Sequence, residues 1–489
     1  MITVENEKSA TARRTWFISI LPVIFICAYP PLFLYFQNAD EAKFSNILMP
    51  MVSFILAGIV LFVIFSIIAK SDVKSSVISS LFILFFLNHK LVEKLAQKVF
   101  PNLRYWHIML IGVFVLVNLS WFIIKKVKDQ YIKTISFLLS IVFIFLIVLN
   151  AIFAIPTYVK KLSYNEKSND KFTRDQTNTI KSDLPNIYYI VLDEYSSVEF
   201  MKKYYAYDNS KFTDYLEESG FSISHTSHNE SIMTSTVMTN IVNLDYVVDN
   251  TMLESEKQIY RKNNALFKLL SDKGYEIIGV GNAEFYGLEN AAANEFGSST
   301  TTVKGETISD LLYKQTIIWP FYSASYTSKM KNIISALNYL KDANNFPSGG
   351  RFTFCHVNCP HEPFFFKENG GTYKNPTSDW ENSRYYLGQY IFTTNQVIEI
   401  VDSITKNDPY SCIIIQSDHG ARASSNSELF MEKFTLEDMS NFFNAVYLKG
   451  KKLDIEGLSA VNTLRLVLNE ILDEDFQMVD VPVDTYKYK

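Results

Sequence analysis

The sequence predicts an α/β protein in two unlike parts: an N-terminal bundle of about five transmembrane helices over residues 1–159, and an α/β/α domain with a mostly parallel central sheet over residues 184–489. Long apolar stretches occur only in the first part, and short β-forming runs alternate with helical patterns in the second. The charge divides in the same way, with +8 on residues 1–160 and −13 on residues 161–489. Because nucleic-acid binding needs a basic surface, the acidic second part argues against a nucleic-acid partner.

Five apolar stretches in the first part approach the roughly 20 residues that a helix needs to cross a bilayer core of about 30 Å. They are Thr15–Phe36, Asn46–Ala69, Ser76–Leu87, Tyr105–Ile124 and Ile135–Val159. The third stretch has only 12 residues, so we expect a short or tilted span there.

The basic residues of the loops predict the orientation of these spans. With the N-terminus inside, nine Lys and Arg residues lie in inner segments and five in outer loops, a bias typical of the cytoplasmic side. Five spans from that start place the C-terminal domain outside. Residues 89–104 combine an apolar face with Lys90, Lys94 and Lys98, which predicts a helix in the membrane interface or a plain amphipathic connector. The polar stretch 160–183 is expected to be a linker or a surface helix.

The second part shows the alternation of an α/β sandwich. The expected strands are Ile187–Leu192, Tyr275–Val280, Phe352–His356, Cys412–Ile415 and Phe442–Leu448. The expected helices are 197–219, 232–243, 256–271, 328–342, 383–405 and 458–472. Of four cysteines, three lie in this part without the spacing of a zinc site, so all four are expected to be buried free thiols.

Charged residues follow two of the expected strands, at the sheet edge where α/β proteins form their sites. Asp193 follows the first strand, and Asp418, His419 and Gly420 follow the fourth. Carboxylates and an imidazole suit a hard or borderline divalent cation. Asp193 alone could equally be a helix N-cap, but the Asp-His-Gly sequence is harder to explain as structure.

The segment from His228 to Val237 is rich in hydroxyl groups and leads into an apolar helix. A Ser or Thr at a helix N-terminus faces unpaired amides, where an anion such as phosphate is favoured. A metal can lower the pKa of such a hydroxyl and make it a nucleophile, with ordinary N-capping as the alternative. A Pro-bounded loop adds His356 and His361. Five of the seven histidines gather in two short loops and at residue 419, namely His225, His228, His356, His361 and His419.

Three segments, Pro185–Asp193, Pro360–Phe364 and Ser417–Gly420, resemble the alkaline phosphatase and sulfatase superfamily. The resemblance is nearer to its bacterial membrane-anchored branch, which includes lipid A phosphoethanolamine transferases and lipoteichoic acid synthases, and it covers essentially the whole chain. It implies an alkaline-phosphatase-like second domain. It also implies a multi-pass protein of the bacterial cytoplasmic (inner) membrane whose catalytic domain is extracytoplasmic or periplasmic.

The same resemblance implies roles for individual residues. The implied metal ligands are Asp193, Thr234, Asp418 and His419. The implied catalytic residues are Thr234 as the nucleophile and His361 at the substrate phosphate or leaving group. The alternatives for the nucleophile are Ser231, Ser235 and Thr236. The candidates for substrate binding are His356, Arg422, Asn229 and Gln389. The expected cofactor is one divalent metal ion, Zn or Mn, with Mg as a further option.

The sequence also departs from the family pattern. Residues 234–238 lack the Pro and Arg that accompany a formylglycine precursor in sulfatases, so sulfate ester hydrolysis by that route is not expected. No histidine follows His419, so one tight metal site is expected in place of two. The planar guanidinium of Arg422 suits phosphate oxygens and is the expected clamp.

These features predict a membrane-bound phosphotransferase. It would move a phosphoethanolamine or phosphoglycerol headgroup from a phospholipid donor to a surface glycan or glycolipid, through a phospho-threonine intermediate. A hydrolase with the same intermediate is the first alternative. A non-catalytic scaffold in surface-polysaccharide assembly is the second. A transporter is poorly supported, because the spans hold few ionisable residues.

Overall fold

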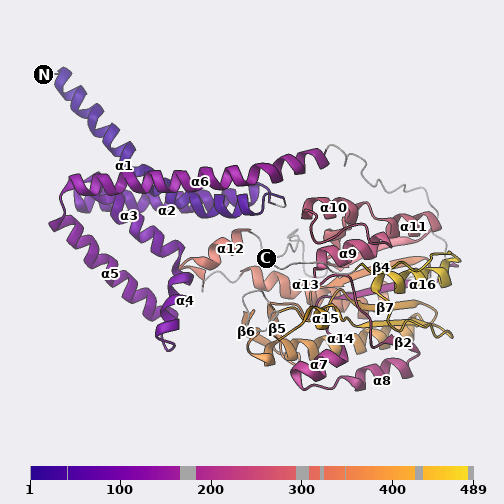
Figure 1. Ribbon diagram of the computed structural model, residues 1–489. Coiled ribbons are helices and arrows are strands. Elements are labelled where there is room, and N and C mark those ends of the chain that lie inside the picture. The colour runs from indigo at the N-terminus through magenta and orange to yellow at the C-terminus, as the bar shows by residue number, and fades with distance from the viewer. Residues whose placement is uncertain are drawn as a thin grey trace. The chain divides into compact units, whose positions relative to one another are not determined.

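The computed structural model describes residues 2–40, 42–165, 183–292, 308–319, 324–346, 349–423 and 433–482 (Figure 1). The chain forms two compact units. The helical unit comprises Met1–Glu166 together with Lys304–Ser325, and the α/β unit comprises Lys167–Val303 and Tyr326–Lys489. No pattern in the sequence indicated that a segment near residue 315 groups with the N-terminal helices.

The helical unit contains long apolar helices joined by short turns. Its helices are α1 (Ile2–Gln37), α2 (Ser45–Ala69), α3 (Asp72–Leu87), α4 (His89–Val99), α5 (Tyr105–Lys126), α6 (Asp129–Asn165) and α12 (Ile308–Gln315). Four of them, α1, α2, α5 and α6, are long and apolar enough to cross a membrane. The pair α3 and α4 becomes a fifth candidate if the 70° bend between them is counted within one broken span. With four or five candidate spans, the expectation of about five spans is confirmed.

The third span is short, as expected. Helix α3 has 16 residues, which gives about 24 Å of helix against a hydrocarbon core of about 30 Å. Helix α4 then turns away with Leu91, Leu95 and Val99 exposed along one stripe, and its place in the membrane interface remains a prediction. Helix α6 continues to Asn165, so the start of the expected linker is helical, and residues 166–182 lie outside the described residues.

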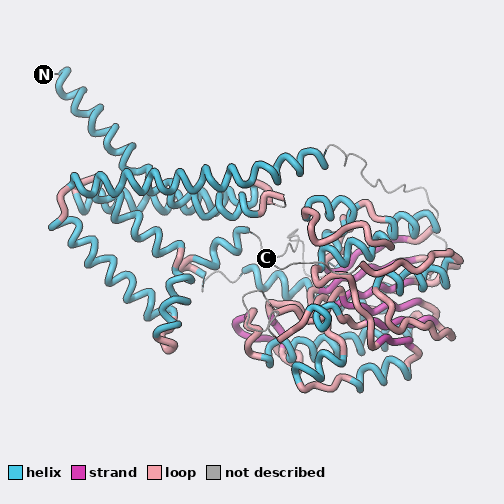
Figure 2. Tube along the Cα trace, viewed as in Figure 1, coloured by secondary structure: helices cyan, strands magenta, loops and turns pink. Residues whose placement is uncertain are grey.

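The α/β unit is built on a six-stranded sheet in the order β2-β8-β7-β1-β4-β3 (Figure 2). The strands are β1 (Ile187–Leu192), β2 (Phe221–Ser224), β3 (Glu276–Gly281), β4 (Arg351–Val357), β7 (Cys412–Ser417) and β8 (Asn444–Leu448). Strands β3, β4, β1 and β7 are parallel neighbours, and β8 is antiparallel to β7 and β2. The mostly parallel sheet is therefore confirmed. Strand β2 and the hairpin β5 (Phe364–Phe366) and β6 (Thr372–Thr377) were not predicted.

Helices cover both faces of this sheet. One face packs on α13 (Ala324–Lys341) and α14 (Ser383–Asn407), and the other on α9 (Thr234–Asn243), α11 (Ala265–Lys273) and α16 (Ala460–Leu472). Strand β1 is buried throughout, because alternate side chains enter the two cores. All four cysteines are buried and free, as expected.

Two expected helices are each divided by a capping residue. The segment 197–219 forms α7 (Val198–Tyr205) and α8 (Ser210–Glu218), because Ala206 ends α7 in the left-handed conformation with φ 50°. The segment 256–271 forms α10 (Glu254–Lys262) and α11, because the Asn264 side chain accepts a hydrogen bond from the Phe267 amide and starts a new helix. The short helix α15 (Leu436–Ser440) precedes β8.

The close approach of β3 to β4 at Gly281 predicts that Gly281→Ala destabilises the protein more than Gly370→Ala does. Gly281 has φ +73°, and a Cβ there would lie 2.3 Å from the carbonyl oxygen of His356, whereas at Gly370, with φ +80°, a Cβ meets nothing within 4 Å. Both alanine variants carry a left-handed cost of about 1–2 kcal/mol, and only Gly281→Ala adds a clash of roughly 1–3 kcal/mol. We expect Gly281→Ala to lower the thermal unfolding temperature of the purified protein clearly more than Gly370→Ala. Equal shifts would contradict the close approach of β3 to β4.

Candidate metal and catalytic site

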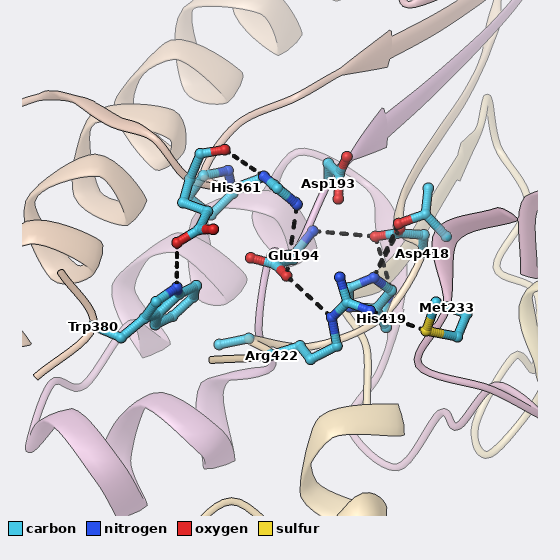
Figure 3. A network of polar contacts seen from close by, with 12 residues as sticks. Asp193, Glu194, Met233, His361, Trp380, Asp418, His419 and Arg422 are labelled. Atoms are coloured by element: carbon cyan, nitrogen blue, oxygen red, sulfur yellow. Dashed lines mark hydrogen bonds and ion pairs between the residues drawn. The ribbon is translucent and has the colours of Figure 1, made fainter. Parts of the chain in front are cut away.

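The site begins at the carboxyl ends of β1 and β7. These strands are parallel neighbours, and Leu192 pairs with Ser417 in register, so the next residues, Asp193 and Asp418, emerge side by side (Figure 3). Sheet topology thus joins two residues that are 225 positions apart in the sequence. Both carboxylates are buried, with relative exposures of 3% and 0%.

Asp193, Asp418 and His419 form a group whose ligand atoms all lie within 4.8 Å of one another. The His419 Nδ1 proton is donated to the Gly420 carbonyl oxygen at 2.8 Å, which leaves the Nε2 lone pair facing Asp418 Oδ2 at 3.2 Å. Burial lowers the pKa of His419, which keeps the ring neutral. Two buried acceptors that face each other without a proton between them repel, and a cation relieves this repulsion.

The hydrogen-bond pattern around these atoms also fits a metal. Asp193 Oδ1 and Asp418 Oδ2 are buried and have no hydrogen-bond partner within the described part of the chain. Such orphaned acceptors are costly unless an ion takes the place of the missing donors. Two carboxylates and one imidazole nitrogen therefore fit a divalent cation at this position.

Thr234 reaches the same group from another element. It is the first residue of α9, and its Oγ1 lies 3.1 Å from His419 Nε2. The hydroxyls of Ser231 and Thr236 instead donate to Asn250 Oδ1 at 2.9 and 2.7 Å. Among the hydroxyls of this segment, the contacts therefore favour Thr234 as the one next to the cluster. The positive end of the α9 dipole also lies there.

Glu194 is a site residue that the sequence argument did not select. Its backbone has φ 64°, its amide donates to Asp418 Oδ1 at 3.1 Å, and its side chain is 1% exposed. Its Oε1 lies 3.9 Å from His361 Nε2 and 3.7 Å from Arg422 Nε (Figure 3). Burial raises the pKa of Glu194 to about 8, although His361 and Arg422 act in the opposite direction. The only sequence signal was a second acidic residue directly after the strand.

His361 is held with its Nε2 directed at this carboxylate. Its Nδ1 donates to the Glu362 carbonyl oxygen at 2.5 Å. Burial lowers the pKa of His361, but the Glu194 and Asp193 carboxylates outweigh this effect and raise the pKa to about 9. The same histidine, with His356 and His419, more than offsets the effect of burial on Asp193 and holds the pKa of that carboxyl well below its usual range.

His356 lies behind Asp193. Its ring is completely buried, Nδ1 is hydrogen-bonded to the Tyr286 hydroxyl at 2.7 Å, and Nε2 lies 3.6 Å from Asp193 Oδ2. These contacts favour a role in orienting Asp193, and substrate binding by His356 stays a prediction. No sequence signal marked Tyr286.

Two of the other expected substrate-binding residues are fully bonded to backbone groups. Asn229 donates to the Asp418 carbonyl oxygen at 2.7 Å and accepts from the Ala460 amide at 3.0 Å. Gln389, on α14, accepts from the amides of Phe365 and Phe366 and donates to the carbonyl oxygens of Pro360 and His361. Both side chains position the site, and their substrate contacts remain untested.

Arg422 lies at the edge of the site. Besides Glu194, its guanidinium contacts Met233 Sδ at 3.0 Å, and its side chain is 26% exposed (Figure 3).

Not all of the clustered histidines belong to the site. The His228 ring contacts Ser440 and Asn441, so the clustering of histidines in the sequence was a weak indication of site residues.

The profile of the sulfatase family matches residues 185–463, which is more than half of the chain. The chain belongs to the sulfatase family. No curated protein sequence matches it.

Three solved structures illustrate the similarity of this sulfatase-family member to known proteins. Lipooligosaccharide phosphoethanolamine transferase A from Neisseria meningitidis is 15% identical, with 93% of this chain and 95% of that chain covered and a TM-score of 0.43. The zinc complex of the C-terminal periplasmic domain of EptC from Escherichia coli is 12% identical, with 56% and 76% covered and a TM-score of 0.36. Lipoteichoic acid synthase LtaP from Listeria monocytogenes is 12% identical, with 63% and 77% covered and a TM-score of 0.38.

The ligand geometry predicts which side chains hold a metal. Asp418→Asn keeps the shape of the side chain but removes its charge, so we expect the affinity for Zn²⁺ or Mn²⁺ to fall by at least about 100-fold, more than loss of an outer partner costs. Titration calorimetry and elemental analysis of the purified protein measure this change. His228→Ala is the control, because that ring contacts Ser440 and Asn441 and not the cluster. Unchanged metal content in Asp418→Asn would contradict the assignment.

The raised pKa values predict the pH dependence of stability in metal-stripped protein. His361 keeps its proton to about pH 9 when folded but loses it near pH 6.5 when unfolded, and Glu194 keeps its proton to about pH 8 against an ordinary value of 4.5. Both contributions are complete at low pH and are lost as the pH rises, that of Glu194 between about pH 4.5 and 8 and that of His361 between about pH 6.5 and 9. The thermal unfolding temperature should therefore fall from about pH 4.5 to 9. His361→Gln should flatten this decline, whereas His228→Gln should leave it intact. An unchanged slope in His361→Gln would refute the interpretation.

Proposed function

We propose that this protein is a membrane-bound, metal-dependent phosphotransferase that moves a phosphoethanolamine or phosphoglycerol headgroup from a phospholipid to a surface or lipid-linked glycan. The supporting observation is the position of the Thr234 hydroxyl at the start of α9, 3.1 Å from His419 Nε2 and beside two buried carboxylates. A hydroxyl at a helix N-terminus next to a metal-type cluster suits attack on a phosphodiester.

Asp193, Asp418, His419 and Thr234 would hold one divalent ion, Zn or Mn, or else Mg. When bound, the ion would lower the pKa of the threonine hydroxyl and offset negative charge on the phosphate. Three of these ligands are held by a neighbour: His356 contacts Asp193, the Glu194 amide donates to Asp418, and the Gly420 carbonyl oxygen sets the tautomer of His419.

In the first step, Thr234 loses its hydroxyl proton to water, its Oγ1 forms a bond to phosphorus, and the bond from phosphorus to the diacylglycerol oxygen breaks. His361 is the acid for that leaving oxygen. Its Nδ1 is occupied by the Glu362 carbonyl oxygen, and its pKa of about 9 keeps it protonated at neutral pH, so Nε2 carries the proton to be donated.

In the second step, the oxygen of a sugar hydroxyl forms a bond to phosphorus, the bond from phosphorus to Thr234 Oγ1 breaks, and neutral His361 accepts the proton of the sugar hydroxyl. Thr234 Oγ1 takes a proton back from water, which restores the free threonine. Throughout, the α9 N-terminus and the Arg422 guanidinium are the positive groups beside the phosphate. The acceptor would be a glycan or glycolipid, and the reaction would take place outside the cytoplasmic membrane of a bacterium, with the catalytic domain periplasmic or extracytoplasmic.

The nucleophile can be identified by trapping. Purified protein incubated with phospholipid should gain the mass of a phospho-headgroup, and peptide mapping should place it on Thr234. Thr234→Ala should lose the adduct and lower turnover by at least about 10³-fold, because the covalent route is closed. Ser235→Ala is the matched control in the next position and should keep both. An adduct on Ser235 would contradict the assignment.

The acceptor is tested with labelled phospholipid, with and without glycan. Transfer of label to the glycan supports the transferase, whereas release of free phospho-headgroup in both cases would show a hydrolase that uses the same residues.

A further inference from the structure

One segment of the central sequence packs with the N-terminal helices. Residues 308–319 lie between β3 and β4 in the sequence, both of which belong to the sheet, yet they group with the helical unit. The segment consists of α12 and a turn that ends at Trp319. Helix α12 lies beside α4 (Figure 1).

Side chains of the segment enter the packing of the apolar helices. Leu312 is 4% exposed and belongs to the same core cluster as residues of α1, α2 and α3. The ring of Tyr313 packs edge-on against Phe54 with centroids 5.6 Å apart, and its hydroxyl is 3.1 Å from Ser53 Oγ. Ser53 and Phe54 are the ninth and tenth residues of α2, so Tyr313 reaches about 12 Å along that helix.

Hydrogen bonds to backbone carbonyl groups add to this packing at both ends of the segment. Ser309 Oγ donates to the Asn46 carbonyl oxygen at 3.0 Å, and the Ile317 amide donates to the Phe86 carbonyl oxygen at 3.0 Å. The Tyr105 hydroxyl donates to the Ile317 carbonyl oxygen. The segment is thus bonded to α2, to α3 and to α5.

These partners mark one end of the helical unit. Asn46 is the second residue of α2, Phe86 is next to last in α3, and Tyr105 begins α5. Helix α6 ends at the same end, because Lys161 Nζ donates to the Ala39 carbonyl oxygen in the turn between α1 and α2. The chain therefore leaves the membrane helices and returns to them on the same side.

We propose that residues 308–319 are a second, non-covalent anchor that holds the α/β unit to the membrane helices independently of the α6 connection. Only residues 320–323 separate Trp319 from α13, so the peptide chain limits the distance between them to roughly 19 Å. Two attachments restrict the motion of the α/β unit more than one attachment does. The inference does not depend on the reaction catalysed.

The test separates the two attachments. A protease site is inserted within residues 166–182 of the full-length protein, which carries an N-terminal tag, and the detergent-purified protein is cut. The anchor predicts that the C-terminal fragment stays bound to the tagged fragment on the affinity resin. Leu312→Asp places a charge in the apolar cluster and should reduce retention by at least about tenfold. Gln315→Ala, an exposed position on the same helix, is the matched control and should retain the fragment.

A second measurement covers the case in which Leu312→Asp fails to fold. Cysteines placed at Ser309 and Asn46 should be joined by a short bifunctional maleimide in the uncut protein, since all four native cysteines are buried. The joined fragments should then run as one band after cutting. Dissociation of the cut wild-type fragments, or failure of the cysteine pair to crosslink, would overturn the proposal, whatever the enzymatic activity of the protein.

Discussion

The repulsion between buried acceptors at the carboxyl ends of β1 and β7 is the constraint on which the site depends. Asp418 Oδ2 and His419 Nε2 are 3.2 Å apart in a fully buried position, and Asp193 is beside them. Folding alone does not neutralise these groups, so the arrangement favours a cation. The surrounding contacts act to keep the acceptors in place: His356 contacts Asp193, the Glu194 amide bonds Asp418, and Asn229 holds the Asp418 backbone.

The acidic character of residues 161–489, at −13, requires positive groups close to the site if a phosphate is to bind. The structure supplies them locally. His361 has a raised pKa because two carboxylates face it, Arg422 lies next to Glu194, and α9 directs its N-terminus at the cluster. Such short-range groups act where the dielectric is low, whereas the net charge of the domain is largely screened by salt.

The helical unit shows how apolar residues serve two purposes. Nearly all exposed large apolar side chains of the described chain lie between residues 17 and 159, which suits contact with lipid. The buried ones, such as Phe54 and Phe62, hold the helices together, and Leu312 joins them from a distant part of the sequence.

The sequence by itself determined the division into an apolar helical part and an α/β part, because hydropathy and periodicity are local properties. It also pointed to Asp193, Asp418 and His419, since charged residues directly after strands carry a signal, and the family resemblance added Thr234 from the hydroxyl-rich segment. Only the tertiary structure showed that the Thr234 hydroxyl contacts His419 whereas the hydroxyls of Ser231 and Thr236 contact Asn250. It also added Glu194 and Tyr286, showed that Gln389 bonds to backbone groups, and placed α12 with the membrane helices. These outcomes depend on contacts between residues far apart in the chain, which no local pattern encodes.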